Sequence, residues 1–162
     1  MTEDLIRALT ANQALFGLEL NGQVMERLSD HYKILLEHNP ILHLVAPCSP
    51  EEFATRHILE SLTLLKHLPL NAKFADVGSG GGLPAIPCLI VREDLSASLI
   101  ESKEKKAAFL ELAIEGLGLK GRAEVVAKQF AESEAGDAKF VTCRALDKFP
   151  ERVQKLARWA GR

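Results

Sequence analysis

A glycine-rich loop between a short apolar strand and a helix constrains the fold of this chain more than any other feature. Residues 74–77 predict a buried strand, and the run from Gly78 to Gly82 breaks it. A helix is expected from Pro84, because Pro84 and Pro87 fall in its first turn, where a missing N–H costs little. Glycines let the backbone turn tightly and bring a ligand against bare N–H groups. The sequence therefore predicts a nucleotide-type binding site at this loop.

The spacing of the glycines indicates which nucleotide binds. The dinucleotide fingerprint has glycine at positions one, three and six, but the sixth position counted from Gly78 is Leu83. A carboxyl group, that of Asp76, stands directly before the loop; it would repel a pyrophosphate but suits an ammonium group or an ordered water beside one. S-adenosylmethionine carries an ammonium and a sulfonium and no phosphate, so it is the favoured ligand. The alternative for Asp76 is a turn or helix-capping carboxylate.

Strands and helices alternate through the second half of the chain. Further strands are expected at 97–101, 124–127 and 139–143, and a helix at 103–115 is expected to be capped by Ser102. This alternation predicts an α/β fold with a parallel, doubly wound sheet. Glu101, at the end of the second strand, is expected to accept hydrogen bonds from ribose hydroxyls; the alternative is a solvated acid at a strand end.

The first half of the chain is predicted to be helical. Helices are expected at 3–16, at 23–38, where Asn39-Pro40 should end the helix, and at 49–68, where Ser49 should cap the helix with Pro50 at its first position. We therefore expect an N-terminal helical cap over residues 1–70. Residues 71–162 are expected to form a partial Rossmann-like domain, continuous with the cap.

Composition excludes several classes of protein. Of the 162 residues, 47% are hydrophobic, a share that excludes intrinsic disorder. The 20 Lys+Arg are balanced by 22 Asp+Glu, so the overall charge gives no strong signal for nucleic-acid binding. No stretch approaches the roughly 18 apolar residues of a membrane span, and the N-terminus lacks a secretion signal. We expect a cytoplasmic protein that does not bind a membrane. Neither the three cysteines nor the five histidines have metal-ligand spacing, so no metal site is predicted.

Three segments resemble one family. DVGSGGGLPAIPCLI at 76–90 resembles the cofactor loop of the ribosomal RNA small-subunit methyltransferase G family, also called glucose-inhibited division protein B, in which L-P-G-I-P follows the glycines. RHILESL at 56–62 is similar to the family's R-H-I-x-D-S-L helix. VTCRA at 141–145 is similar to its V-x-S-R-A at the fourth strand. The resemblance covers roughly residues 20–160.

The resemblance implies a fold, an activity and a site. The fold would be the Rossmann-like fold of S-adenosylmethionine-dependent methyltransferases with an N-terminal helical cap, and the reaction would be methylation of N7 of a guanine in 16S ribosomal RNA, free or in the small ribosomal subunit. The glycines would contact the methionine moiety, Glu101 would lie near the ribose, Ala131 and Glu132 near the adenine, and Arg144 at the mouth of the site. The candidate cofactor-binding residues are Asp76, Gly78, Ser79, Gly80, Gly82, Glu101, Ser102, Ala131, Glu132 and Arg144. No residue is assigned a catalytic role, because the N7 lone pair needs no general base.

Two segments differ from the family pattern, and they leave alternatives open. His43-Leu44-Val45 stands where the family has N-L-T, and residues 128–131 stand where it has G-R-A-E. The alternatives are a cofactor-binding remnant without activity and a methyltransferase that acts on a protein or a small molecule.

The family sheet has seven strands and four are placed here, so we expect a C-terminally truncated chain. Separately, we expect the protein to be a monomer. We also hypothesise phosphate contacts by basic residues near the C-terminus, for which the alternative is a solvated helix face; they are Lys148, Arg152, Lys155, Arg158 and Arg162.

Overall fold

The computed structural model describes residues 1–144 and 149–161. The elements in chain order are α1 (Thr2–Asn12), η1 (Gln13–Phe16), α2 (Gly22–Leu42), α3 (Pro50–Glu52), η2 (Phe53–Leu59), α4 (Glu60–Leu62), η3 (Thr63–His67), β1 (Lys73–Val77), α5 (Ala85–Val91), β2 (Ser96–Ile100), α6 (Glu104–Gly116), β3 (Ala123–Val126), η4 (Phe130–Glu132), β4 (Phe140–Cys143) and α7 (Phe149–Ala160). Each predicted strand is present, with ends that differ by at most one residue. No helix in the described ranges is long and apolar enough to cross a membrane.

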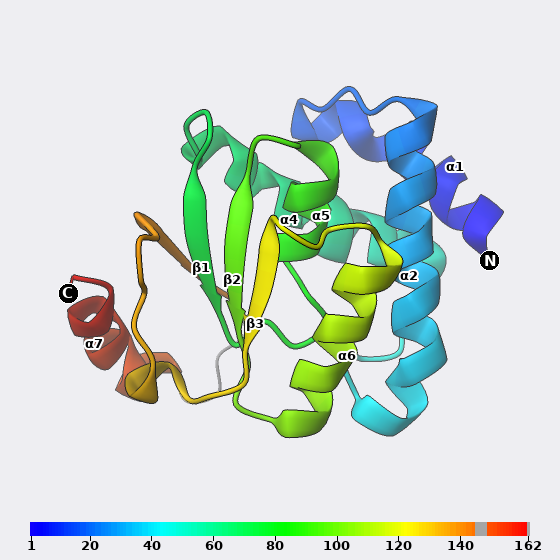
Figure 1. The fold of residues 1–162 in the computed structure, drawn as a ribbon. Coiled ribbons are helices and arrows are strands. Elements are labelled where there is room, and N and C mark those ends of the chain that lie inside the picture. Colours follow the sequence, from blue (N-terminus) through cyan, green and yellow to red (C-terminus); the bar gives the residue numbers. More distant parts are fainter. Residues whose placement is uncertain (145–148, 162) are drawn as a thin grey trace.

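The strands of the described residues form one parallel sheet in the order β3-β2-β1-β4. The order reverses between β1 and β4, because β4 pairs with β1 on the side opposite β2. In Figure 1, α2 and α6 lie beyond the β3 side of the view and α7 beyond the β1 side. Open sheets of this kind bind ligands outside the carboxyl ends of the strands at the point of reversal. The predicted α/β class with a parallel sheet is confirmed.

Alternate residues of the strands belong to different hydrophobic clusters. Phe74 of β1 and Leu99 of β2 belong to the larger cluster, whereas Ala75, Val77 and Ile100 belong to a smaller one with α7. This follows from the two-residue period of a strand, which turns successive side chains to opposite faces of the sheet. Apolar residues on both sides of the strands therefore let helices pack on both faces, as in a doubly wound sheet.

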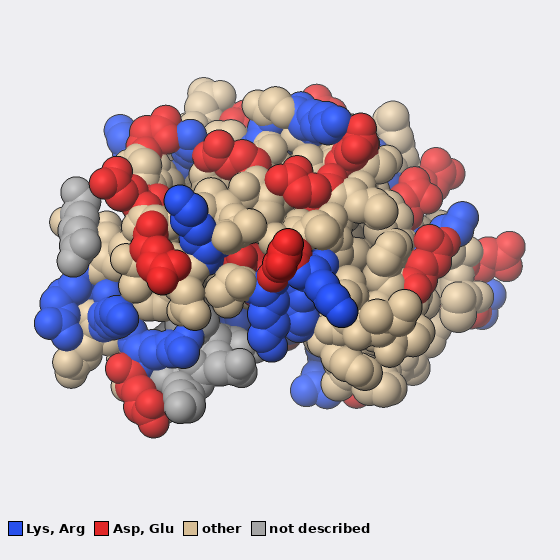
Figure 2. Space-filling view, turned by 60° about the horizontal axis from the view of Figure 1, so that its bottom comes forward, with Lys and Arg blue, Asp and Glu red and all other residues tan. Residues whose placement is uncertain are grey.

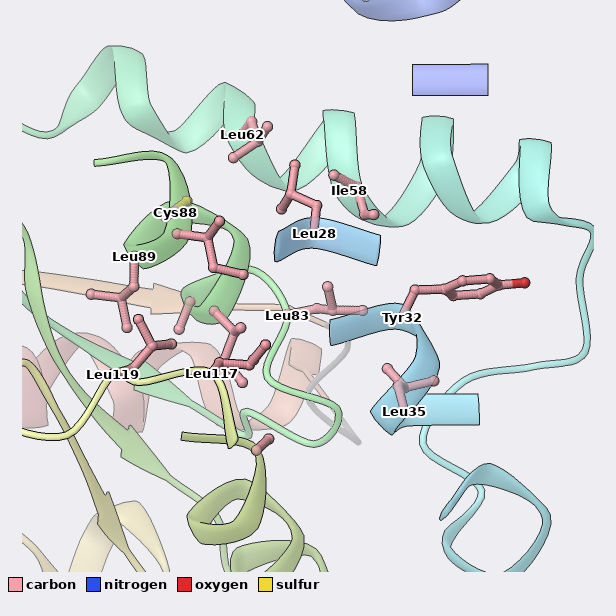
Figure 3. Packing of buried hydrophobic residues seen from close by; sticks show 14 of the residues in the cluster. Leu28, Tyr32, Leu35, Ile58, Leu62, Leu83, Cys88, Leu89, Leu117 and Leu119 are labelled. Carbon is pink, nitrogen blue, oxygen red and sulfur yellow. The ribbon is translucent and has the colours of Figure 1, made fainter. Parts of the chain in front are cut away.

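The helical first half shares the larger cluster with the sheet. Figure 3 shows Leu28 of α2 beside the helical segment that carries Ile58 and Leu62, and Leu35 of α2 and Leu89 of α5 belong to the same cluster. All five of these side chains are fully buried. One continuous cluster thus spans both sides of residue 70; the division into a cap and a partial domain stays a prediction.

Helix α2 corrects the expectation that Asn39-Pro40 ends it. The helix continues through Pro40 to Leu42 and ends at His43, which has a left-handed backbone (φ 49°) and donates its N–H to Asn39 O at 2.9 Å. A proline lacks one backbone N–H and so removes one hydrogen bond from the helix, which costs little stability when only two helical residues follow it. The Asn39 side chain also bonds the residues that follow the helix.

The helical segment over residues 50–67 begins as predicted and then departs from α-helical geometry. Ser49 Oγ accepts the N–H of Glu52 at 3.1 Å, and Pro50 stands in the first turn. Residues 53–59 are then π-helical (η2), a rare geometry that is frequent at functional sites.

Candidate functional site

A cavity of about 400 Å³ opens at the carboxyl edge of β1 and β2. Its lining comes from the glycine loop, the segment after α2, the π-helical segment, the residues from the end of β2 to the start of α6, the end of β4 and α7. The lining residues are Leu44, Val45, Ala46, His57, Gly78, Ser79, Gly80, Gly81, Leu83, Glu101, Ser102, Lys103, Lys106, Arg144 and Arg152.

Glu101 fixes the glycine loop to the second strand. Its Oε2 accepts the N–H of Gly80 at 3.0 Å and its Oε1 accepts the N–H of Lys103 at 2.9 Å, while only 7% of the residue is exposed. Glu101 thus bonds the residue directly before α6, the helix that Ser102 was expected to cap. The start of α6 has no side-chain cap at its N-cap residue, so the Ser102 cap was wrong; Ser102 lines the cavity instead.

Three glycines of the loop have backbone conformations that other residues rarely adopt. Gly78, Gly80 and Gly82 have φ of 75°, 52° and 81°, the left-handed region that side chains disfavour. A Cβ at Gly82 would lie 2.3 Å from Ile86 Cδ1, and the Gly82 N–H donates to Ser79 O at 2.7 Å. Gly82 therefore shapes the turn from behind and is not among the residues that line the cavity.

Asp76 is enclosed beneath the loop. No part of the residue is exposed; its Oδ2 accepts from Ser79 Oγ at 2.8 Å and its Oδ1 from Thr142 Oγ1 at 2.8 Å. Burial raises the pKa of this carboxyl to about 6, against the two hydroxyl donors, which lower the pKa. Asp76 thus ties the loop after β1 to the neighbouring strand β4, and it does not line the cavity.

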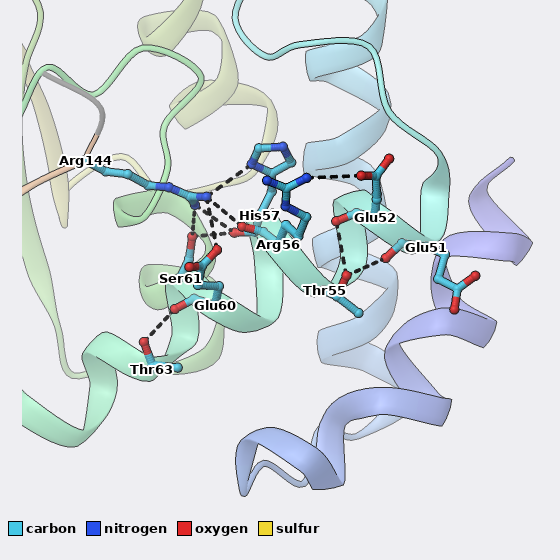
Figure 4. A network of polar contacts seen from close by, with 9 residues as sticks. All are labelled: Glu51, Glu52, Thr55, Arg56, His57, Glu60, Ser61, Thr63 and Arg144. Carbon is cyan, nitrogen blue, oxygen red and sulfur yellow. Dashed lines mark hydrogen bonds and ion pairs between the residues drawn. The ribbon is translucent and has the colours of Figure 1, made fainter. Parts of the chain in front are cut away.

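Arg144, at the end of β4, reaches the π-helical segment (Figure 4). Its Nη2 donates to Arg56 O at 2.6 Å and its Nη1 to Ser61 Oγ at 3.2 Å. Glu60 Oε2 lies 3.4 Å from Nη2. A planar guanidinium can satisfy several acceptors at once, so Arg144, which lines the cavity, joins the sheet to the helical first half.

His57 lines the cavity beside Arg144. Its Nδ1 is 3.4 Å from Arg144 Nη2, and because a guanidinium only donates, Nδ1 is the acceptor. Burial lowers the pKa of His57, and the positive charges of Arg144 and Arg56 lower it further. The lowered pKa and the acceptor role of Nδ1 both favour the neutral imidazole.

Basic side chains surround the rim of the cavity. Lys103, Lys106, Arg144 and Arg152 line it, against the carboxylate of Glu101. Figure 2 brings this edge of the molecule forward and shows blue side chains beside a hollow. Of the other basic residues singled out, Lys155 and Arg158 line a separate depression beside Trp159; Lys148 and Arg162 lie outside the described residues.

The structure brings six of the ten candidate residues to the cavity, and they are Gly78, Ser79, Gly80, Glu101, Ser102 and Arg144. Asp76 lies beneath the loop, and Gly82 is a loop residue that does not line the cavity. Ala131 and Glu132 are exposed on η4, also outside the lining. The wall over residues 44–46 was not among the candidate residues, although its Leu44 and Val45 belong to the segment His43-Leu44-Val45 that stands where the family has N-L-T. The described residues hold no group of three or more His, Cys, Asp or Glu that could bind a metal ion.

A solved structure identifies the fold class. The S-adenosylmethionine-dependent methyltransferase from Thiobacillus denitrificans, in complex with S-adenosylhomocysteine, superposes with a TM-score of 0.52 at 19% sequence identity, over 79% of this chain and 50% of that chain. The fold is therefore the Rossmann-like fold of these methyltransferases.

Sequence comparison identifies the family. The model of the family described as rRNA small subunit methyltransferase G (GidB) matches residues 24–161. The protein of that name from Sorangium cellulosum is 42% identical over 109 residues, 65% of this chain and 46% of that protein. The one from Neisseria meningitidis FAM18 is 35% identical over 153 residues, 94% of this chain and 72% of that protein. The chain belongs to the rRNA small subunit methyltransferase G family, and spans about half the length of the first relatives it matches.

Proposed function

We propose that this protein is an S-adenosylmethionine-dependent methyltransferase that acts on N7 of a guanine in 16S ribosomal RNA. Membership of the family supports the activity, and one geometric observation carries the site: the Glu101 carboxylate bonds Gly80 of the glycine loop inside the cavity. The proposed substrate is the RNA of the small ribosomal subunit, which places the protein in the cytoplasm, and the proposed form is a monomer.

The cavity fits the proposed cofactor in size and in chemistry. Sites for small ligands measure about 300–1,000 Å³, and this cavity measures about 400 Å³. Each oxygen of Glu101 accepts one amide, and a carboxylate oxygen has further lone-pair sites, which could receive the ribose hydroxyls. Gly78, Ser79 and Gly80 would bind the methionine moiety, with Ser102 nearby. Contacts of Ala131 and Glu132 with the adenine stay a prediction.

The proposed chemistry asks this chain for positioning alone. S-adenosylmethionine supplies a methyl group on a sulfonium, and transfer to N7 forms the N–C bond as the electron pair of the broken C–S bond returns to sulfur. No proton leaves N7, so the site needs no general base. The Asp76 carboxyl, engaged by two hydroxyls, is accordingly left to a structural role. Holding the reactants in line can contribute roughly 7–11 kcal/mol, and the apolar wall over residues 44–46 helps to exclude water.

The basic rim supports the proposed RNA substrate. Lys103, Lys106 and Arg152 surround the opening through which a base would enter. Phosphate contacts of Lys and Arg give most of the affinity for nucleic acid and fix its orientation. We infer that these side chains hold the backbone on either side of the target guanine.

Transfer of labelled methyl from S-adenosylmethionine tests the proposal. The acceptors are small ribosomal subunits, and separately naked 16S RNA, from a strain that lacks the modification. Label in RNA that digests to 7-methylguanosine is the expected result. Binding heat for S-adenosylmethionine with no label in any acceptor would support an inactive remnant. Label transferred instead to protein or to small molecules would support the third alternative, and no heat at millimolar cofactor would overturn every methyltransferase hypothesis.

A further inference from the structure

One face of α2 touches both sides of the cavity without lining it. His31, Leu35 and Asn39 recur at intervals of four residues, so they lie on the same face of the helix. His31 and Leu35 contact the glycine loop at Gly81, and Asn39 bonds the segment that follows the helix. The contacts of these three residues show how α2 acts on the cavity.

His31 fixes a peptide unit of the glycine loop. Its Nε2 lies 2.9 Å from the carbonyl oxygen of Gly81; the carbonyl can only accept, so Nε2 carries the proton. The N–H of the same peptide unit belongs to Gly82 and donates to Ser79 O at 2.7 Å. The Gly81-Gly82 peptide is thus held at both ends, directly after the loop residues that line the cavity.

The His31 ring is buried, and its one hydrogen bond within the described residues is the bond to Gly81 O. None of the residue is exposed, and its Nδ1 has no hydrogen-bond partner in the described part of the chain. A buried nitrogen without a partner lowers stability, so the ring is not simply the best packing solution at this position. The hydrogen bond to Gly81 is what distinguishes histidine there from an apolar residue.

Leu35 contacts the same loop residue by packing. A Cβ added at Gly81 would lie 3.0 Å from Leu35 Cδ1 and 3.5 Å from Leu44 Cβ. Helix, loop and wall therefore pack closely at Gly81, where even a Cβ would press on Leu35, and a shift of α2 would be passed to both sides of the cavity.

Asn39 fixes the opposite wall. Its Oδ1 accepts the N–H groups of Leu44 at 2.7 Å and Val45 at 3.0 Å, and its Nδ2 donates to Val45 O at 3.0 Å. Leu44, Val45 and Ala46 line the cavity. One amide side chain thus determines where this wall leaves the helix.

We propose that the His31–Leu35–Asn39 face of α2 sets the separation of the two sides of the cofactor cavity. His31 is the positioning residue for the glycine loop, and Asn39 is the positioning residue for the wall over residues 44–46. The inference rests on the proposed function, since it takes the cavity to be the S-adenosylmethionine site.

Calorimetric titration with S-adenosylhomocysteine tests both positions at a temperature where each variant is folded. His31→Leu and Asn39→Ala should each raise the Kd by about tenfold, the factor that about 1.4 kcal/mol produces. His31→Gln should stay within about threefold of the wild type, because its amide can still donate to Gly81 O. The matched control is His38→Gln, because the His38 nitrogen bonds only Ile34 O within α2 and its ring contacts Phe109. It should change stability and leave the Kd unchanged.

The outcomes separate the two proposals. A wild-type protein that gives no heat would overturn the proposed function. A wild-type protein that binds, with His31→Leu and Asn39→Ala binding equally well, would overturn the positioning role alone, and so would an equal loss in His38→Gln. Should the leucine variant fail to fold, NMR of the wild-type protein decides: the His31 Nε2–H resonance should shift on addition of S-adenosylhomocysteine, and an unmoved resonance would overturn the inference for His31.

Discussion

Glu101 and Gly80 are joined by a hydrogen bond of 3.0 Å from the loop amide to the carboxylate. The other carboxylate oxygen takes the amide of Lys103, directly before α6. One side chain therefore fixes the end of β2, the loop after β1 and the start of a helix. The same carboxylate lines the cavity, so loop geometry and ligand binding depend on a single residue.

Glu101→Gln should weaken binding of S-adenosylhomocysteine by about tenfold or more. An amide has one acceptor oxygen, so it can accept either the Gly80 or the Lys103 N–H, while its NH₂ group opposes the other donor. Calorimetric titration measures the Kd. Glu104→Gln is the matched control, since Glu104 is exposed in the first turn of α6 and should leave the Kd unchanged. Equal affinity in Glu101→Gln and the wild type would contradict the role given to the carboxylate.

Gly82→Ala should lower the free energy of unfolding by about 2–4 kcal/mol, the sum of a left-handed backbone and an overlap in a packed core. The added Cβ would lie 2.3 Å from the buried Ile86 side chain, at a φ of 81°. Gly121→Ala separates the two effects, because Gly121 has a φ of 89° and no atom within 4 Å of the added Cβ; it should cost about 1 kcal/mol. Urea unfolding measures both, and equal losses would show that Ile86 moves aside freely.

Local signals predicted the part of the site that lies close in sequence. The strand, glycine loop and prolines placed β1 and α5, and Ser49-Pro50 marked the start of α3. Glu101 could be placed beside the loop, because the carboxyl ends of parallel strands meet at one edge of a sheet. These inferences depend on the spacing of apolar residues within each helix or strand and on the parallel direction of the strands, and both can be predicted from sequence.

Interactions between distant residues could not be predicted in this way. Arg144 bonds the carbonyl of Arg56, which is 88 residues away, and carbonyls carry no sequence signature. Asn39 was expected to end a helix because proline follows it, but its side chain instead bonds the segment beyond the helix. The position of η4, which leaves Ala131 and Glu132 outside the cavity lining, depends on how η4 packs against α7 through Phe130 and Trp159.

Arg144→Met should raise the pKa of His57 toward its ordinary value. The charge of Arg144 is the second cause of the lowered pKa, after burial, and methionine keeps much of the bulk without the charge. NMR titration of the imidazole resonances measures this pKa. The variant should also lose about 1–2 kcal/mol of unfolding free energy, because the hydrogen bonds to Arg56 O and Ser61 Oγ are lost.

Arg56→Met is the matched control for the stability measurement on this variant; it is not a control for the His57 pKa, which the charge of Arg56 also lowers. The Arg56 side chain is 73% exposed and pairs with Glu52 one turn away in the same helical segment, an arrangement that contributes little to stability. Its free energy of unfolding should stay within about 0.5 kcal/mol of the wild type. A His57 pKa unchanged in Arg144→Met would contradict the electrostatic part of the contact.

Two buried groups should give opposite dependences of stability on pH. The pKa of Asp76 is raised from 3.8 to about 6 by burial, so between these values the folded state binds more protons and the free energy of unfolding falls as pH rises. The pKa of His31 is lowered from 6.5 to about 4 by burial, so the unfolded state binds more protons and the free energy of unfolding rises with pH over nearly the same interval. In the wild-type protein the two contributions largely cancel between pH 4 and 6.

Removing either Asp76 or His31 should reveal the pH dependence of stability that the remaining group produces. From pH 4 to 7 the unfolding free energy of Asp76→Asn, relative to the wild type, should rise by about 3 kcal/mol, because each pKa unit corresponds to about 1.4 kcal/mol. The same difference for His31→Gln should fall by about 3 kcal/mol. Urea unfolding at pH 4, 5, 6 and 7 gives both differences, and the double variant, which lacks both groups, should run parallel to the wild type. If the difference in unfolding free energy between each single variant and the wild type did not change with pH, the pKa shifts of both Asp76 and His31 would be contradicted.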